Sequence, residues 1–346
     1  MLSGWSIKKI TKLLDSNYYP TKELGDALVA AAMRRRKDIV LLLLDRGADI
    51  NLVVGSQYGS VLAVAARKGE AEMISLLLDR GADINLVVDG IYGTALAAAA
   101  CGKLLSIVTM LLDRGADTNI MSGKYGTSLA AAAYYGNTHI VSLLLDRGAG
   151  IDEMGGEYGT ALVAAAFHGR KDTMLELLAR GADINMVSGE YGTALAAAVW
   201  WGRDKDTLLL LLDRGANINQ VGGKYGTALA TAAYRGNVDI VSLLLSRGAD
   251  INLVGGEYGT ALAAAAWPGQ NTDTLSLLLD RGADINRVGG KYGTALAAAA
   301  YWGKIDTVSL LLSRGADINR VGGEYGTALA AGISFASKDT MLLLLD

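Results

Sequence analysis

A short string, Tyr-Gly-Thr or its Ser variant, recurs every 33 or 34 residues through most of this 346-residue chain, and Arg-Gly-Ala recurs in the same phase. The tyrosines are Tyr58, Tyr92, Tyr125, Tyr158, Tyr191, Tyr225, Tyr258, Tyr292 and Tyr325, and the arginines are Arg46, Arg80, Arg114, Arg147, Arg180, Arg214, Arg247, Arg281 and Arg314. Self-similarity at a fixed period of this length indicates an architecture built from one supersecondary motif. We therefore predict one array of like repeats, although the length alone would suggest two or three separate domains.

Within one repeat, the sequence predicts two helices. In a repeat near the C-terminus, Thr294 can accept a hydrogen bond at the start of a first helix over 295–300, which is a run of Ala and Leu. A second, leucine-rich helix is predicted over 305–312 and stops before Gly315, because glycine permits the left-handed backbone of a helix C-terminus. The stretch 316–324 is too rich in glycine for a helix, and we expect an extended finger that leads to the next repeat.

A single pair of such helices buries almost no apolar surface by itself. The second helix is apolar on more than one face, so both sides must be covered, and stacking on neighbouring repeats achieves this. We therefore predict an all-α solenoid of about ten helix-turn-helix units of 33–34 residues, joined by glycine-rich fingers. Alanine lets backbones approach more closely than leucine does, so we expect the alanine-rich first helices on the concave side.

These residues resemble the ankyrin repeat family. The resemblance rests on the period, on Gly-Ala-Asp-Ile-Asn after the second helix (282–286), and on Thr-x-Leu-x-x-Ala-Ala at the start of the first helix (294–300). Where the family usually has Pro and His, this repeat has Ala295 and Ala297, and its finger carries Gly-Gly-Lys-Tyr-Gly. This variant resembles ankyrin arrays common in large fungal proteins. The resemblance implies protein binding, commonly through the two residues before the glycine between the helices.

The sequence divides into an N-terminal cap and the array. Residues 1–20 are predicted to form a capping helix, because 6–17 resembles the second half of a repeat with lysines on its outer face. The first full repeat is expected to begin its helix at Asp26. Residues 21–346 are predicted to form the array, with a truncated last repeat, since the final leucines are not followed by Arg-Gly. Either more chain follows in the natural protein or an apolar end is left for another molecule.

Aromatic residues gather at the ends of the predicted first helices. Apart from the repeat tyrosines, thirteen aromatic residues remain, and ten of them lie in this one column. Tyr and Trp are favoured at binding hot spots, so we predict an aromatic ladder that contacts a partner along one edge of the concave face. The predicted contact residues are Tyr134, Tyr135, Phe167, Trp200, Trp201, Tyr234, Trp267, Tyr301 and Trp302. The alternative is that these rings only cover the turn between the helices and stack on one another.

Three other features have mainly structural interpretations. The repeat tyrosines are predicted to pack under the fingers, because a residue needed by every repeat usually serves the repeat itself. Opposite charges at Lys124/Glu157, Lys224/Glu257 and Lys291/Glu324 are expected to form surface ion pairs between adjacent fingers. Cys101 stands in the aromatic column, where we expect a small, half-buried thiol.

Catalysis and nucleic-acid binding are not predicted. The two histidines, His139 and His168, fall in different repeats, so neither a metal site nor a nucleophile with its base can be nominated, and no cofactor is expected. A pI near 5.5 gives no general attraction to nucleic acid. The basic cluster formed by Lys8, Lys9, Lys12, Arg34, Arg35, Arg36 and Lys37 is local. Charged residues and glycines interrupt every apolar stretch well short of the ~18–20 residues that a membrane span needs.

Two main hypotheses about function remain. The first is a non-catalytic, intracellular and cytoplasmic module that binds a protein or peptide on its concave aromatic face. The second is a structural solenoid that associates end to end through its uncapped, leucine-rich C-terminal repeat and propagates into oligomers or filaments. A third possibility is that the chain is the sensor part of a larger protein.

Overall fold

The structure is a computed structural model, which describes residues 21–55, 58–201, 205–267, 272–335 and 338–345. Over these residues the chain forms ten successive helix pairs, which confirms the predicted all-α solenoid. The capping helix predicted within 1–20 lies outside the described residues. The pairs are α2 (Thr21–Met33) and α3 (Lys37–Asp45), α4 (Val61–Lys68) and α5 (Ala71–Asp79), α6 (Ala95–Cys101) and α7 (Leu105–Asp113), α8 (Ser128–Tyr135) and α9 (Thr138–Asp146), α10 (Ala161–Phe167) and α11 (Lys171–Ala179), α12 (Ala194–Trp201) and α13 (Lys205–Asp213), α14 (Ala228–Tyr234) and α15 (Val238–Ser246), α16 (Ala261–Ala265) and α17 (Thr272–Asp280), α18 (Ala295–Tyr301) and α19 (Ile305–Ser313), and α20 (Ala328–Phe335) and α21 (Lys338–Leu345).

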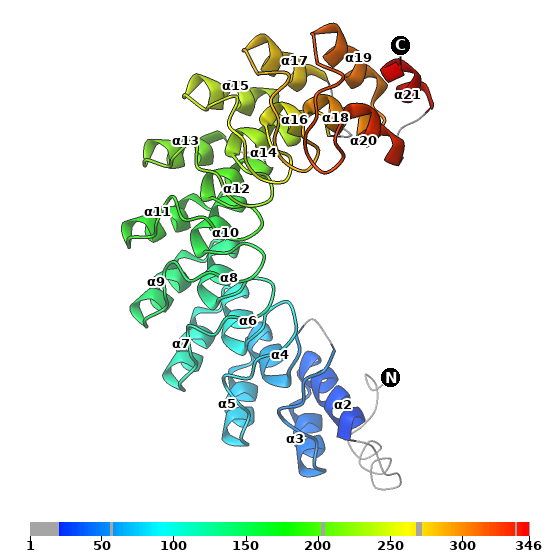
Figure 1. Cartoon of the computed structure of the whole chain (residues 1–346). Helices are drawn as coiled ribbons and strands as arrows, with labels where there is room; N and C mark the ends of the chain where they lie inside the picture. The colour runs from blue at the N-terminus through cyan, green and yellow to red at the C-terminus, as the bar shows by residue number, and fades with distance from the viewer. Residues whose placement is uncertain (1–20, 56–57, 202–204, 268–271, 336–337, 346) are drawn as a thin grey trace. The chain divides into compact units, whose positions relative to one another are not determined.

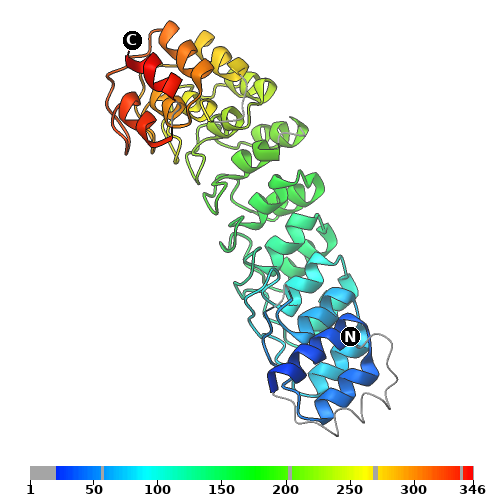
Figure 2. The ribbon, with the colours of Figure 1, turned by 90° about the vertical axis from the view of Figure 1, so that its right-hand side faces the viewer.

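The chain separates into two compact blocks. The N-terminal block comprises Met1–Ala164 and Asp172–Ala182, and the C-terminal block comprises Ala165–Lys171 and Asp183–Asp346. Within the N-terminal block, the first helices α4, α6 and α8 lie between the second helices α5, α7 and α9 and the fingers (Figure 1). Figure 2 shows the fingers of this block projecting from one edge of the helix pairs.

The ends of the helices follow the sequence signals. At the start of α18, the side chain of Thr294 accepts a hydrogen bond from the backbone N–H of Ala297 at 3.1 Å, as predicted. The second helix α19 ends before Gly315, whose φ of +89° is left-handed, and Ala316 N–H then donates to the Leu311 carbonyl at 3.0 Å. Leu311 itself is fully buried, so the capped helix delivers its apolar face to the core.

The start of the first helix corrects one prediction. Helix α2 begins at Thr21, five residues before the expected start at Asp26. Gly25 therefore lies inside the helix, although a start at Asp26 would have left it outside. A Cβ on Gly25 would collide with the side chain of Leu52, so this glycine permits a close approach between the helix and the first finger.

Backbone hydrogen bonds tie neighbouring fingers together. In the C-terminal block, the N–H groups of Lys224, Glu257, Lys291 and Glu324 each donate to the carbonyl of the equivalent residue one repeat earlier, at 2.7–2.8 Å. Each finger of this block is closed by a single antiparallel bridge, such as Gly222 with Gly226. Neighbouring fingers within the block are therefore held to one another by hydrogen bonds. Their extended backbone agrees with the predicted finger.

Side-chain ion pairs between fingers agree with the sequence only in part. Lys124 pairs with Glu157 at 3.2 Å, as predicted. Lys224 was expected to pair with Glu257, but it lies 3.8 Å from Glu190 of the preceding finger. Lys224 has an acidic residue on both sides along the row, and the sequence pattern could not choose between them. At about 40% side-chain exposure, such pairs add little to stability.

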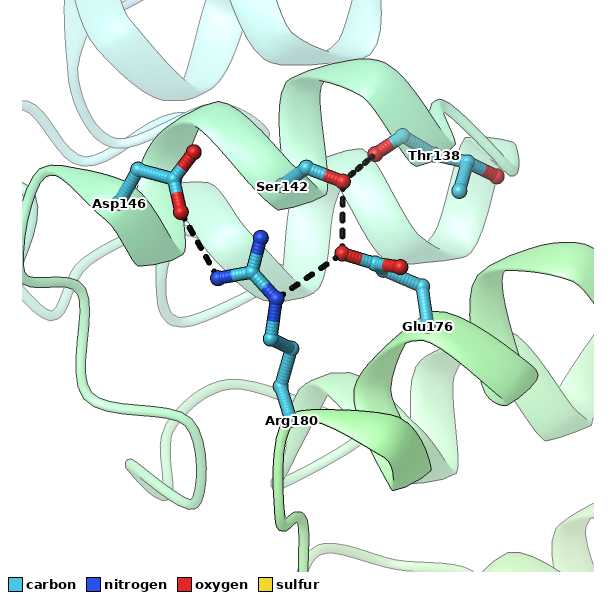
Figure 3. Close-up of polar contacts among 5 residues, drawn as sticks. All are labelled: Thr138, Ser142, Asp146, Glu176 and Arg180. Atoms are coloured by element: carbon cyan, nitrogen blue, oxygen red, sulfur yellow. Dashed lines mark hydrogen bonds and ion pairs between the residues drawn. The ribbon is translucent and has the colours of Figure 1, made fainter.

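The second helices carry a further row of ion pairs. Four arginines of the N-terminal block reach the aspartate at the end of the preceding second helix, as Arg180 reaches Asp146 at 2.8 Å. In Figure 3, Arg180 also contacts Glu176, which accepts a hydrogen bond from Ser142 at 2.8 Å. Glu176 stands where the neighbouring repeats have leucine, so this site exchanges apolar contact for a polar network between α9 and α11.

Candidate functional site

The repeat tyrosines form the buried frame of the candidate site. Those from Tyr58 to Tyr292 are buried. Among these, four pairs of consecutive rings stack with centroids 5.5–6.3 Å apart, namely Tyr58/Tyr92, Tyr125/Tyr158, Tyr225/Tyr258 and Tyr258/Tyr292. Burial raises the pKa of Tyr125, Tyr225 and Tyr258 well above the ordinary tyrosine range and raises the pKa of Tyr292 to about 12. These phenols are neutral near pH 7, and each one offers an apolar ring with a polar hydroxyl at its tip. The repeat tyrosines, from Tyr58 to Tyr325, are called rungs below.

The predicted contact residues at the first position of the aromatic column lie between these rungs. Tyr234 is 5.1 Å from the Tyr225 ring and 4.9 Å from the Tyr258 ring. Five more predicted residues occupy the equivalent position, namely Tyr134, Phe167, Trp200, Trp267 and Tyr301. Phe167 is only 6% exposed and packs on Tyr191 at 4.6 Å. Rings at the first position therefore pack against the repeat tyrosines.

Residues at the second position are more varied and differ in exposure. Tyr135 is half-buried, and its hydroxyl lies 3.0 Å from that of Tyr125. Trp302 packs on Trp267 with the ring centroids 4.4 Å apart. Trp201 is 39% exposed, whereas its neighbour Trp200 is half-buried. The pair Trp200 and Trp201 is therefore divided between packing and surface.

A pocket opens beside Trp201 within the C-terminal block. Its volume is about 340 Å³. The lining residues are Ala166, Phe167, His168, Gly169, Arg170, Ala198, Trp201 and Thr207. Phe167 and Trp201 meet edge to face at 6.0 Å, and His168 lies 5.7 Å from the Trp201 ring. The pocket thus offers two aromatic walls with an imidazole and a guanidinium at its lining, which suits an apolar side chain with a polar end.

Some residues of this pocket were missed by the sequence analysis. Arg170 and Thr207 were not among the predicted contact residues, and His168 was named only as one of two histidines that fall in different repeats. The sequence signal that could have indicated the pocket is that the aromatic column consists of two adjacent positions in each repeat. Treating each adjacent pair as one feature hid the difference between Trp201, which is 39% exposed, and Trp200, which is half-buried.

Cys101 lies deeper than expected. It is buried, not half-buried, because it occupies the same space between rungs that a ring fills in later repeats. Burial raises the pKa of this thiol to about 12, against a small lowering effect of Arg67. A thiol of this kind is neutral near pH 7 and is a poor nucleophile. Over the described ranges, no group of three or more His, Cys, Asp or Glu residues is placed to hold a metal ion.

The basic segment after α2 is largely compensated by neighbouring acids. Arg35 pairs with Glu70 at 2.8 Å and Lys37 pairs with Glu72 at 3.1 Å, both across repeats. Arg36 is held by Asp38 at 2.7 Å, which lowers the pKa of that carboxyl. These pairs leave little uncompensated positive charge on α2 and α3 for a phosphate backbone.

Comparison with known proteins gives the family. A model described as ankyrin repeats (3 copies) matches residues 6–88, 28–122, 94–188, 129–222, 195–289, 229–322 and 264–346. The chain belongs to the ankyrin repeat family. An ankyrin repeat domain is a protein-interaction module, so the family supports that general role here.

Among solved structures, the ankyrin repeat array is similar to the crystal structure of the human ASB11 ankyrin repeat domain. The two share 27% sequence identity with a TM-score of 0.52, over 64% of this chain and 98% of that one. No curated protein matches the chain. Among the helices that the structure describes, none has the length and apolar character needed to cross a membrane.

Proposed function

We propose that this ankyrin array is a non-catalytic module that binds a protein or peptide along its aromatic-lined face. The observation that carries the proposal is the exposed ring of Trp201 beside a pocket of about 340 Å³, next to a buried frame of tyrosines. Aromatic side chains held by such a frame lose little freedom on binding, which favours affinity. Since its single cysteine can form no internal disulfide, we infer a reducing, cytoplasmic location.

The predicted contact residues take two roles in this proposal. Those at the second position, Tyr135, Trp201 and Trp302, contact the partner. Those at the first position hold the frame; they are Tyr134, Phe167, Trp200, Tyr234, Trp267 and Tyr301. The half-burial of Trp200 beside the exposed Trp201 supports this division.

Selection of peptides from a displayed random library on the folded chain would supply ligands for a test. Replacing Trp201 by Ala should weaken the selected peptides about tenfold or more, since a hot-spot tryptophan contributes at least ~1.4 kcal/mol. Val221→Ser, on a finger of the same block, is the matched control and should leave binding unchanged. Selected peptides that bind equally well to Trp201→Ala and Trp302→Ala would disprove the aromatic site.

Self-association is a second candidate, favoured by apolar exposure in the last helix pair. Ile333 in α20 is 73% exposed, and Leu342 and Leu345 in α21 are also exposed. Light scattering across a wide concentration range tests this candidate. A mass that rises with concentration and returns to the monomer in Ile333→Ser would support end-to-end association, whereas a constant monomer mass would exclude it.

A further inference from the structure

The fingers of the N-terminal block present a row of exposed apolar side chains. Each of four consecutive fingers contributes one such residue at the same position: Val53, Val87, Met121 and Met154. Met121 is 56% exposed and Val87 is 51% exposed. Ile91 adds another exposed apolar side chain beside Val87. Solitary exposed apolar residues need no explanation, but here the same position is apolar and exposed in four successive fingers.

The same fingers carry a strong excess of negative charge. Across 48–59, 82–93, 116–126 and 149–159 there are seven acidic residues and one basic residue, Lys124, which is paired with Glu157. The acidic residues are Asp49, Asp83, Asp89, Asp117, Asp152, Glu153 and Glu157. The five finger segments of the C-terminal block contain seven acidic and four basic residues, and the basic residues include Arg287 and Arg320. The excess of acidic over basic residues is therefore larger in the fingers of the N-terminal block, with six against three in the C-terminal block.

Three acidic residues of these fingers, Asp49, Asp83 and Asp117, share one arrangement. Asp49, Asp83 and Asp117 are exposed, and each accepts a hydrogen bond from the backbone N–H two residues later, at 2.9 Å. Among the residues that the structure describes, none of these three carboxylates has a cationic partner. The aspartates that end the second helices differ, since Asp45 and Asp79 are paired with arginines at 3.0–3.2 Å.

The row is held in place before any partner arrives. Lys124 N–H donates to the Ile91 carbonyl at 2.9 Å, and Glu157 N–H donates to the Lys124 carbonyl at 2.8 Å. At the base of the fingers, the side-chain oxygens of Asn51 and Asn85 accept from the backbone of the next finger at 2.8 Å. A surface fixed in this way loses little conformational entropy on binding.

We propose that this finger surface docks a basic, amphipathic helix of a protein partner. Its charge calls for lysine or arginine flanking an apolar stripe, and its methionines and valines suit an apolar helix face. Packed helix pairs lie about 8–10 Å apart, and one heptad of α-helix advances about 10.5 Å, so apolar residues seven apart match successive fingers. This surface is separate from the aromatic site, and the docking proposal stands whether or not that site binds a partner.

The probe is a fluorescein-labelled helical peptide of about 20 residues with leucine on one face and lysine on the other. Fluorescence anisotropy with the full chain should show binding that weakens as salt is raised. Val87→Ser combined with Met121→Ser should weaken it about tenfold, and Asp83→Asn combined with Asp117→Asn about fivefold. Far-UV circular dichroism confirms that these surface variants stay folded.

Matched variants in the C-terminal block give the control. Val187→Ser with Val221→Ser, and Asp250→Asn with Asp284→Asn, should leave binding unchanged, and so should Trp201→Ala. Equal weakening by the C-terminal variants, equal binding of a peptide with its leucines replaced by serine, or no binding at all would overturn the proposal. It would also be overturned by a concentration-dependent mass that Val87→Ser with Met121→Ser abolishes, because the occupant would then be a second copy of the chain.

Discussion

The two blocks fill the space between tyrosine rungs in different ways. In the C-terminal block, rings alternate without a break from Tyr191 to Tyr325, with neighbouring centroids 4.5–6.4 Å apart. In the N-terminal block, a ring occupies this position in one repeat, where Tyr134 lies between Tyr125 and Tyr158. Arg67 and Cys101 occupy it in two others, and Arg67 donates a hydrogen bond to the Tyr92 hydroxyl at 3.3 Å. The fingers and helix pairs are nevertheless alike. The backbone of a repeat therefore depends on the tyrosine rung, whereas the residue between rungs is free to vary in chemistry.

If this comparison is right, removing a repeat tyrosine should lower the free energy of unfolding more in the C-terminal block than in the N-terminal block. Tyr258 lies within 4.9–6.3 Å of four rings, whereas Tyr92 stacks on Tyr58 and contacts Arg67. Tyr258→Ala should lower the free energy of unfolding by about 4 kcal/mol, and Tyr92→Ala by about 1 kcal/mol less. Urea unfolding followed by circular dichroism measures both. Equal losses would mean that the ring stack adds nothing beyond burial.

The glycine that follows each tyrosine should be equally important in both blocks. Gly126 and Gly226 have φ of +79° and +83°, and a Cβ on either would collide with the backbone of the next finger, at Gly155 or Gly255. Gly126→Ala and Gly226→Ala should each lower the free energy of unfolding by about 3 kcal/mol. This loss combines the strain of a left-handed backbone with a backbone clash that no side-chain movement can relieve.

Gly248 is the matched control for this clash. Its φ is +91°, but a Cβ there would meet no atom within 4 Å, so Gly248→Ala should cost only the strain of about 1–2 kcal/mol. Midpoints of urea unfolding for the three variants separate the two contributions. A large difference between Gly126→Ala and Gly226→Ala would show that the finger contact is not common to the blocks.

Much of this fold follows from the sequence because the repeat shows the same signal many times. Threonine caps such as Thr294 and the glycine stop at Gly315 are local signals, and the structure confirms them. The start of α2 was predicted at Asp26, whereas the helix already includes Gly25, a poor helix former that lies close to Leu52. Such a contact is not local, and it is set by how closely the helix approaches the first finger.

The candidate site could be predicted only to the level of a column. Composition located the aromatic residues, but it could not tell which of Trp200 and Trp201 enters the space between rungs. That choice depends on the turn after the first helix, which directs adjacent side chains to different surroundings. The same limit applies to Cys101, whose burial depends on the neighbouring rungs and not on its own type.

Cys101 offers the finest test of the comparison, because it gives the N-terminal block a titrating group where the C-terminal block has rings. Its pKa rises from an ordinary value of 9.0 to about 12 on folding, since burial disfavours the thiolate. The folded state therefore holds this proton more tightly than the unfolded state. The stability that the neutral thiol supplies is complete below pH 9 and is lost progressively as the pH rises from about 9 to 12.

Between pH 8 and pH 10, this titration should lower the free energy of unfolding by about 1 kcal/mol more in the natural chain than in Cys101→Ala. Urea unfolding of both chains at the two pH values isolates the contribution of the thiol, which includes its effect in raising the pKa of Tyr125 and Tyr135. In parallel, an aromatic disulfide reagent should modify the folded chain far more slowly than the urea-unfolded chain. The same pH dependence in both chains, or rapid modification of the folded chain, would place the thiol at the surface and would remove the equivalence between Cys101 and the intercalated rings.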